Sequence, residues 1–359
     1  MLTIREKWER FLKTESTTST VSYLEPLFRF LPDNTAQHLW INSRVLPNSE
    51  VVAEVTALKE GQALIKGDMV IAYHCGTSTK RYNFERKDHL SEDFGVHESK
   101  VHSEVIHRVA DIFTNNGAQI IADLKLMKPV GEPTYSSSIQ IIGDHPILMK
   151  GAKAEACIFN TTNGPIYVGE GAEIMEGAML RGPIAICAGA QVKMGAKIYG
   201  DTTIGPGCKV GGEITNSVFF ANSNKAHDGF IGNSVIGEWC NLGADTNTSN
   251  LKNNYGEVSV YNYAISGTED SGMQFHGLIM GDHSKCGINT MFNTGTVVGV
   301  GANIFGGGFP KKFIPDFSWG GESGMVEFEF GKFIEMVQNV YKRRSKTLSE
   351  QELAALKHV

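Results

Sequence analysis

Apolar residues recur at every sixth position over a long stretch in the second half of the chain. A period of six fits neither an α-helix nor an isolated amphipathic strand. It predicts a triangular coil in which each six-residue unit forms one short strand and one turn, with the apolar side chains stacked inside. The first eight apolar positions are Val168, Ile174, Leu180, Ile186, Val192, Ile198, Ile204 and Val210.

The six-residue register stops after Val210 and then returns twice. The second set is Phe230, Ile236 and Leu242, and the third runs from Met280 to Ile304. Together the sets give sixteen units, which predicts about five coils at three units per coil. Many of the 40 glycines fall within the repeat, where they supply turn conformations that other residues resist. The repeat is broken at 216–229 and at about 248–277, and function is expected where loops leave a regular wall.

The N-terminal part of the chain, 1–140, has a different pattern, in which helical and strand periods alternate. Residues 4–13, 49–58 and part of 101–124 predict helices, whereas 39–46, 63–67 and 68–75 predict strands. We expect Ser49 to cap the second helix, and Asn116–Gly117 to interrupt or end the third. Alternation of this kind favours an α/β layer. The predicted domains are an α/β domain at 1–140, a β-helix at 141–315, and a linker with C-terminal helices at 316–359.

Charge and composition exclude some classes of function. A net charge of −6 argues against nucleic acid as the main partner, and no run of about 18 apolar residues predicts a membrane span. The six cysteines show no C-x-x-C spacing, so we expect reduced thiols in a cytoplasmic protein.

The stretch SNKAHDGFIGNSVIGEWCNLGADTNTSNLKNNYGEV at 223–258 resembles the acetyltransferase half of a known enzyme family. These are the bifunctional N-acetylglucosamine-1-phosphate uridylyltransferase/glucosamine-1-phosphate acetyltransferases. The resemblance implies a left-handed parallel β-helix, a homotrimer, and acetyl-CoA bound between neighbouring subunits. In that family the N-terminal domain joins a sugar phosphate to UTP through a glycine-rich phosphate loop. Here the first glycine is Gly61, so we expect the 1–140 domain to be incomplete.

The resemblance also implies roles for individual residues. His227 is the expected general base, since an imidazole can take the proton of an attacking amine at neutral pH. Asp228 is expected to tune it, and Asn250 to hold the sugar or its amine. Lys225 and Lys252 are the expected ligands of the sugar phosphate.

Four further residues complete the predicted site. Phe230 stands where the family commonly has a tyrosine, so it cannot donate a hydrogen bond. Backbone N–H groups around Gly281 and Gly299 are expected to meet the thioester and the pantetheine arm. Arg181 has two open interpretations, a substitute phosphate ligand or a solvated residue on the coil wall.

The sequence therefore predicts acetyl transfer from acetyl-CoA to an amino-sugar 1-phosphate, glucosamine-1-phosphate above all, in UDP-N-acetylglucosamine synthesis. Two alternatives stay open. One is a sugar-1-phosphate nucleotidylyltransferase using UTP and Mg²⁺, with the β-helix as a trimerisation scaffold. The other is a non-catalytic assembly protein. A zinc site at His227, His276 and His283 lacks the close histidine pair that such sites carry in related proteins, and no metal is predicted there.

Overall fold

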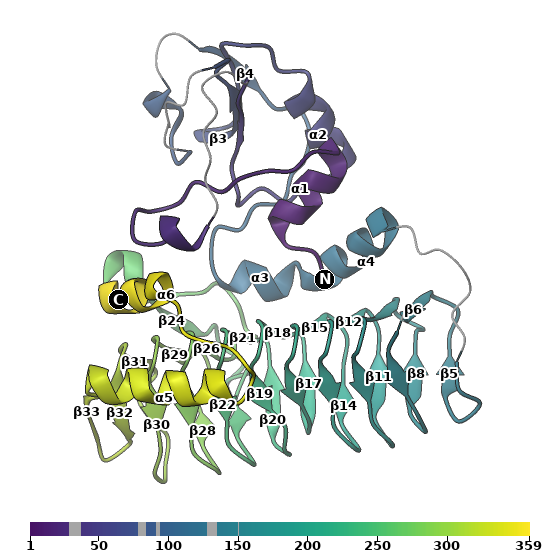
Figure 1. Cartoon of the computed structure of the whole chain (residues 1–359), viewed down its shortest axis with the longest axis vertical. Helices are drawn as coiled ribbons and strands as arrows, with labels where there is room; N and C mark the ends of the chain where they lie inside the picture. Colours follow the sequence, from purple (N-terminus) through teal and green to yellow (C-terminus); the bar gives the residue numbers. More distant parts are fainter. Residues whose placement is uncertain (29–36, 78–83, 91–93, 128–134, 150) are drawn as a thin grey trace. The chain divides into compact units, whose positions relative to one another are not determined.

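The computed structural model describes residues 1–28, 37–77, 84–90, 94–127, 135–149 and 151–359, which form two compact units (Figure 1). The smaller unit comprises residues 2–107 and 350–358, and the larger comprises 108–349 together with the two terminal residues. The boundary therefore falls at 107/108, whereas the sequence pattern placed it at 140. The predicted order of an α/β region, a parallel β-helix and C-terminal helices is confirmed.

The smaller unit contains a four-stranded sheet of order β1-β3-β2-β4, in which only the β2–β4 pair is parallel. Its core includes Trp8, whose indole N–H donates to the carbonyl of Val45 at 2.9 Å. Asn48, and not the expected Ser49, caps α2: its side chain accepts from the backbone N–H groups of Glu50 and Val51. The elements are α1 Ile4–Leu12, η1 Glu25–Leu27, β1 Leu39–Ile41, α2 Ser49–Thr56, β2 Gln62–Lys66, β3 Met69–His74, η2 Lys87–His89, β4 Gly95–Glu98 and α6 Glu350–His358.

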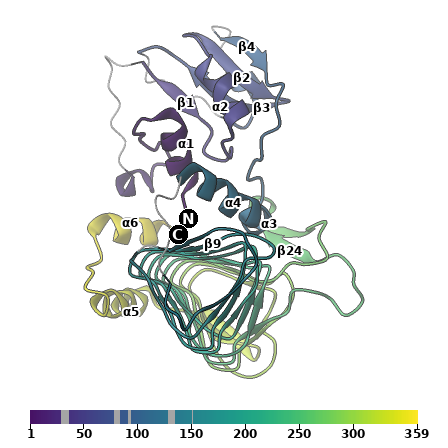
Figure 2. The ribbon, with the colours of Figure 1, turned by 90° about the vertical axis from the view of Figure 1, so that its right-hand side faces the viewer.

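The larger unit is a parallel β-solenoid whose triangular coils are visible end-on in Figure 2. Face A consists of β7 Lys153–Ala154, β10 Glu173–Ile174, β13 Gln191–Val192, β16 Lys209–Val210, β19 Asn224–Lys225, β22 Asn241–Leu242, β27 Lys285–Cys286, β30 Asn303–Ile304 and β32 Ser318–Gly321, closed by antiparallel β33 Gly324–Glu327. Face B consists of β5 Gln140–Ile142, β8 Ile158–Asn160, β11 Met179–Arg181, β14 Lys197–Ile198, β17 Glu213–Thr215 and β20 Phe230–Gly232, followed by the pair β23 Asn247–Thr248 and β28 Met291–Phe292. Face C consists of β6 Ile147–Met149, β9 Ile166–Val168, β12 Ile184–Ile186, β15 Thr202–Ile204, β18 Val218–Phe219, β21 Val235–Ile236, β26 Ile279–Met280, β29 Val297–Val298 and β31 Phe313–Ile314.

Two faces thus have nine parallel strands each within the described residues, so the expected number of about five coils was too low. The count of six-residue units missed the coils whose length is not a multiple of six residues. Val192 pairs with Val210 at the regular interval, but Val210 pairs with Lys225 after a shorter step along the chain. Leu242 pairs with Cys286 after a much longer one.

The apolar stack predicted before residue 211 is confirmed, since all eight aliphatic side chains are buried. Glycines turn the corners between faces with positive φ angles, for example 65° at Gly189. The two later sets, which end at Ile304, are also buried, with Phe230 as the one exception. Ile231 is the buried partner of Ile214, and Phe230 lies on the outer side of its strand, partly exposed.

The two predicted interruptions differ. Segment 216–229 does not leave the solenoid, because it contains β18 and β19, which pair in parallel on both sides. Segment 248–277 does leave it, and forms an antiparallel hairpin of β24 Ser259–Asn262 and β25 Gly267–Asp270 around η3 Tyr263–Ile265.

Three helices complete the larger unit. α3 (Ala110–Thr114) and α4 (Asn116–Met127) lie on face C, where Phe113 packs with Val218 and Val235. α5 (Phe330–Lys342) packs by Phe333, Val337 and Tyr341. None of the helices described is long and apolar enough to cross a bilayer. All six cysteines are free thiols, and Cys208 and Cys240 are fully buried, as core packing requires.

Candidate functional site

Lys225 is part of the solenoid interior. Its side chain is 1% exposed and occupies the position of the aliphatic stack that Val210 fills in the preceding coil. The ammonium group donates to the carbonyls of His227 at 2.6 Å, Asp228 at 2.7 Å and Gly211 at 3.3 Å. Burial lowers the pKa of Lys225 to about 8, against the opposing pull of Asp228 and Asp245. Its three protons therefore hold the turn that follows it, and we do not retain Lys225 as a phosphate ligand.

That turn presents His227 and Asp228 to solvent between faces A and B. The two adjacent side chains do not pair, and His227 has no side-chain hydrogen bond among the residues that the structure describes. The turn itself is fixed, because Lys225 holds two of its carbonyls and the next coil donates from Asp245 N to Asp228 O at 3.0 Å. The result is an exposed imidazole on a rigid backbone.

Asn250 and Phe230 converge on the other end of β20. The Asn250 amide donates from Nδ2 to Oδ1 of Asn233 at 2.7 Å. A Cβ added at Gly232 would lie 2.5 Å from Nδ2 of Asn250 and 2.7 Å from Cζ of Phe230, so both side chains use the space that this glycine leaves. His227 precedes β20 and Asn233 follows it, so one chain holds His227 and Asn250 at opposite ends of the same strand.

Basic side chains from distant parts of the sequence gather near Asn250. The backbone N–H of His276 donates to the carbonyl of Asn250 at 2.9 Å. Burial lowers the pKa of Lys312, and the nearby charge of Lys252 lowers it further. Burial also lowers the pKa of His276, where Arg108 and Lys312 add to the effect. Lys252 itself contacts the carbonyl of Glu257. Sequence reasoning missed Lys312 and Arg108, since no local motif connects them to Asn250.

Gly281 and Gly299 do not offer their own N–H groups to a ligand. The N–H of Gly281 donates to Val298 O and that of Gly299 to Ile314 O, each at 2.8 Å, as part of the ladder between coils. The two glycines are needed because successive coils approach closely: a Cβ at Gly281 would lie 2.8 Å from the carbonyl carbon of Gly299.

Arg181 lies apart from all these residues. Its side chain is exposed and lines a hollow of about 570 Å³ beside the N-terminal half of α4. His227, Asn250 and Lys252 do not line this hollow.

The histidines of the zinc alternative do not meet. His276 is buried against the ring of Phe113, and His283 packs with Trp239 and α5. Across the described ranges, no group of three His, Cys, Asp or Glu side chains is placed to hold a metal ion.

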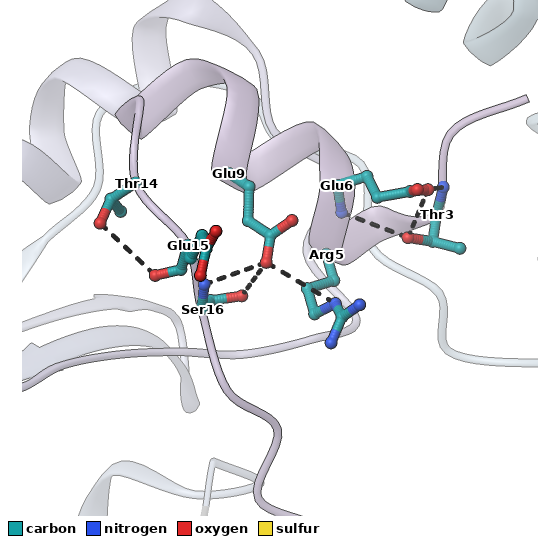
Figure 3. Close-up of polar contacts among 7 residues, drawn as sticks. All are labelled: Thr3, Arg5, Glu6, Glu9, Thr14, Glu15 and Ser16. Carbon is teal, nitrogen blue, oxygen red and sulfur yellow. Dashed lines mark hydrogen bonds and ion pairs between the residues drawn. The ribbon is translucent and has the colours of Figure 1, made fainter. Parts of the chain in front are cut away.

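The smaller unit has a hollow of its own, of about 860 Å³. It is lined by α1, by the hydroxyl-rich segment 14–21, and by aromatic residues that include Trp40 and Tyr73. Figure 3 shows how its edge is held: the carboxylate of Glu9 accepts from Ser16 N at 3.0 Å and Ser16 Oγ at 2.8 Å. Although partial burial acts to raise it, these bonds and Arg5 keep the pKa of Glu9 below its usual value. Hydroxyls and aromatic rings that line one hollow suit a sugar or nucleoside.

Comparison with known proteins supports a transferase. Residues 1–129 match the model of a family described as sugar nucleotidyl transferase. The chain is 36% identical over 95 residues to the bifunctional protein GlmU of Methanococcus maripaludis, an alignment covering 25% of this chain and 22% of that protein. It is 27% identical over 115 residues to GlmU of Synechococcus elongatus, covering 32% and 21%. The match thus spans about a fifth of the length of these relatives. The resemblance inferred from the sequence is confirmed.

Solved structures are more distant. The polysialic-acid-specific acetyltransferase NeuO has a TM-score of 0.32 and 12% identity, over 54% of this chain and 87% of that one. The UDP-N-acetylglucosamine acyltransferase of Francisella novicida has a TM-score of 0.26 and 12% identity, over 57% and 74%. At these values no conclusion about this chain follows from the structural likeness.

Proposed function

We propose that the solenoid unit is an acetyl-CoA-dependent N-acetyltransferase that acts on an amino-sugar 1-phosphate, with glucosamine-1-phosphate as the first acceptor to test. The observation that carries the proposal is His227, an exposed imidazole without a hydrogen-bond partner in the described chain, on a turn that Lys225 fixes from inside. A general base must be free to meet its substrate and must not move away from it. Here the base takes the proton of the sugar amine as the nitrogen attacks the thioester.

The acceptor subsite is proposed at the Asn250 end of β20. Asn250 has its Nδ2 group engaged with Asn233, which orients its carbonyl oxygen as an acceptor for the amine or a sugar hydroxyl. Lys252 and Lys312 together replace the phosphate role that the sequence assigned to Lys225 and Lys252. The charge of Lys252 lowers the pKa of Lys312 beyond the effect of burial, as expected of two neighbouring cations that a bound phosphate would neutralise.

A homotrimer follows from the same geometry as a proposal. His227 and Asn250 lie toward opposite ends of one strand, and a neighbouring copy would complete the site by bringing a second corner to the substrate. Acetyl-CoA would lie between those copies. The free thiols suit a reducing compartment, so we propose a cytoplasmic protein in UDP-N-acetylglucosamine synthesis.

The smaller unit supports a second activity, sugar-1-phosphate nucleotidyl transfer. Its match at residues 1–129 and its hydroxyl-lined hollow favour binding of a sugar or nucleotide. UTP would be the nucleotide and Mg²⁺ would neutralise its phosphates.

The deciding experiment measures release of free CoA thiol from acetyl-CoA by the purified chain, with and without glucosamine-1-phosphate. Acceptor-dependent release supports the acetyltransferase. Release with another amino sugar alone would change the acceptor. No release with a panel of amino sugars would overturn the proposal and leave the solenoid as an assembly scaffold. The same protein is then given UTP and N-acetylglucosamine-1-phosphate, and pyrophosphate is measured.

A further inference from the structure

Basic side chains from the coils and from the C-terminal helix meet on the outer side of face A. Lys209 of β16 lies between Gln191 of β13 and Asn224 of β19 in the parallel ladder. The end of α5 reaches the same strands (Figure 1). There the guanidinium group of Arg344 donates to the carbonyl of Gly207 at 3.0 Å and to Oδ1 of Asn224 at 3.4 Å. Lys209 and Arg344 therefore lie next to the same asparagine.

Two further cations complete this group. Nζ of Lys193 donates to Oε1 of Gln191 at 3.0 Å, one strand before Lys209. Burial lowers the pKa of Lys209, and three neighbouring cations lower it further, namely Arg344, Lys193 and Arg343. We call these four residues the face A basic cluster. Like charges that gather in one place repel one another, so the cluster lowers stability unless an anion joins it.

The protein itself does not supply that anion. Within the described chain no carboxylate forms an ion pair with any member of the cluster. The side-chain hydrogen bonds of Lys193 and Arg344 go to uncharged groups, and Nζ of Lys209 donates to no described residue. The dipole of α5 favours cations in its last turn, but it does not account for the two lysines, which belong to the coils.

The end of α5 is fixed in place before any ligand arrives. The backbone N–H of Arg344 donates to the carbonyl of Tyr341 at 2.8 Å. The ring of Tyr341 packs on that of Trp239 with the centroids 4.4 Å apart, and the ammonium group of Lys346 lies 5.2 Å from the centroid of Trp239. Little ordering of the helix end therefore has to accompany binding.

The spacing of the cations selects the kind of anion. Lys193 is held beside Gln191 and Arg344 beside Asn224, with Lys209 on the strand between them. Neighbouring strands lie about 4.8 Å apart, so the positive charges extend over roughly 10 Å. A single orthophosphate cannot contact all of them, whereas a linear chain of two or three phosphates can. Lysine and arginine both bind phosphate oxygens through charge-assisted hydrogen bonds.

We propose that the face A basic cluster binds a linear phosphate chain, which is either free tripolyphosphate or the triphosphate of a nucleotide. Arg344 and Lys193 contact its two ends and Lys209 contacts its centre. The bound chain also links α5 to the coils, so its binding stabilises the solenoid unit. None of these residues is assigned to acetyl transfer, and none belongs to the smaller unit. The proposal therefore depends on neither proposed activity.

Isothermal titration of the full chain tests the proposal, with tripolyphosphate and orthophosphate as probes at equal ionic strength and without divalent cations. We expect tripolyphosphate to bind more tightly than orthophosphate. Lys209→Gln and Lys193→Gln should each weaken its binding at least about tenfold, the usual effect of losing a charge-assisted hydrogen bond. Lys153→Gln is the matched control, because Lys153 is an exposed lysine of the same face, three strands from Lys209, and this variant should bind as the wild type does.

Competition with UTP identifies the source of the phosphate chain. Displacement of tripolyphosphate by UTP would point to a nucleotide, and its absence would point to the free phosphate chain; both results support the site. Circular dichroism checks that the variants fold.

Four outcomes would overturn the proposal. Binding that is equal in the wild type and in both lysine variants would place the probe elsewhere in the chain. Orthophosphate binding as tightly as tripolyphosphate would remove the role of chain length. A hexaglutamate peptide that binds as tightly, with the same loss in Lys209→Gln, would indicate a general surface for acidic partners. No binding of tripolyphosphate at millimolar concentration would show that the cluster is not a phosphate site.

Discussion

The coils before Gly211 and the coils that follow it have the same triangular cross-section but different interior side chains. From Val168 to Val210 the coils share one length, stack aliphatic side chains and turn on glycine. The next two coils are shorter, stack the lysine Lys225, and expose His227 at the turn. The strand ladder continues through both regions. A solenoid can therefore acquire a reactive side chain by changing one coil, without extending a loop from its wall.

The largest expected effect comes from the exposed imidazole of the irregular coil. His227→Ala should lower acetyl transfer by about 10²–10⁴-fold, as expected for loss of a general base, while the secondary structure is unchanged. The rate of CoA thiol release gives the measurement. His145→Ala, at an exposed histidine early in the solenoid unit, is the matched control. Turnover near the wild-type rate in His227→Ala would remove the residue from the mechanism.

The next largest effect is the loss of stability when the Lys225 side chain is truncated. Lys225→Ala should reduce the free energy of unfolding of the solenoid by about 3 kcal/mol, because it opens a cavity and leaves three carbonyls without their charged donor. Val192→Ala, in a regular coil, should cost less, since it removes only packing. Lys225→Met restores volume without donors and should fall between the wild type and Lys225→Ala. Urea unfolding measures all three. A loss below about 0.5 kcal/mol in Lys225→Ala would mean that the buried contacts contribute little.

A smaller effect is expected at the end of β20 where we propose the acceptor subsite. Gly232→Ala should raise the acceptor KM about tenfold, because the new methyl group displaces Asn250 and Phe230 from the space they share. Asn250→Ala should act in the same direction. Gly189→Ala, in a regular corner with nothing within 4 Å, should leave the KM unchanged and reduce stability slightly through its positive φ. Unchanged kinetics in both Gly232→Ala and Asn250→Ala would move the acceptor elsewhere.

The last expected effect is a pH dependence of stability. The pKa of Lys225 is lowered to about 8 in the folded chain, whereas an unfolded lysine titrates near 10.4. Between these values the unfolded chain binds more protons, so stability should rise as pH increases from about 8 to about 10. Lys225→Met should lack this component, and the difference between the two unfolding curves measures it. A difference that does not vary with pH would contradict the assigned titration.

The sequence predicted most of the solenoid interior and missed two positions of the shortened coils, Lys225 and Ile231, for a physical reason. Val168 to Val210 recur at a constant interval, so periodicity alone identifies the interior. Lys225 is a charged residue in the stack, which no hydrophobic pattern can reveal, and the shortened coil places Ile231 inside where Phe230 was expected. Lys312 comes near Lys252 because the long coil that carries the hairpin returns to the stack, where Cys286 pairs with Leu242. Residues far apart in the sequence become neighbours when coils stack, and a sequence pattern does not show such contacts.

The buried lysine also bears on how a repetitive chain finds its own register. Aliphatic coils of equal length can stack on the wrong neighbour with little loss, which invites misfolding by slippage. Lys225 fits only where Gly211 on one side and the carbonyls of its own turn can take its protons. Stacked one coil out of place, its charge would lie unpaired among apolar side chains, at a high cost. We expect this single polar position to fix the order in which the coils assemble.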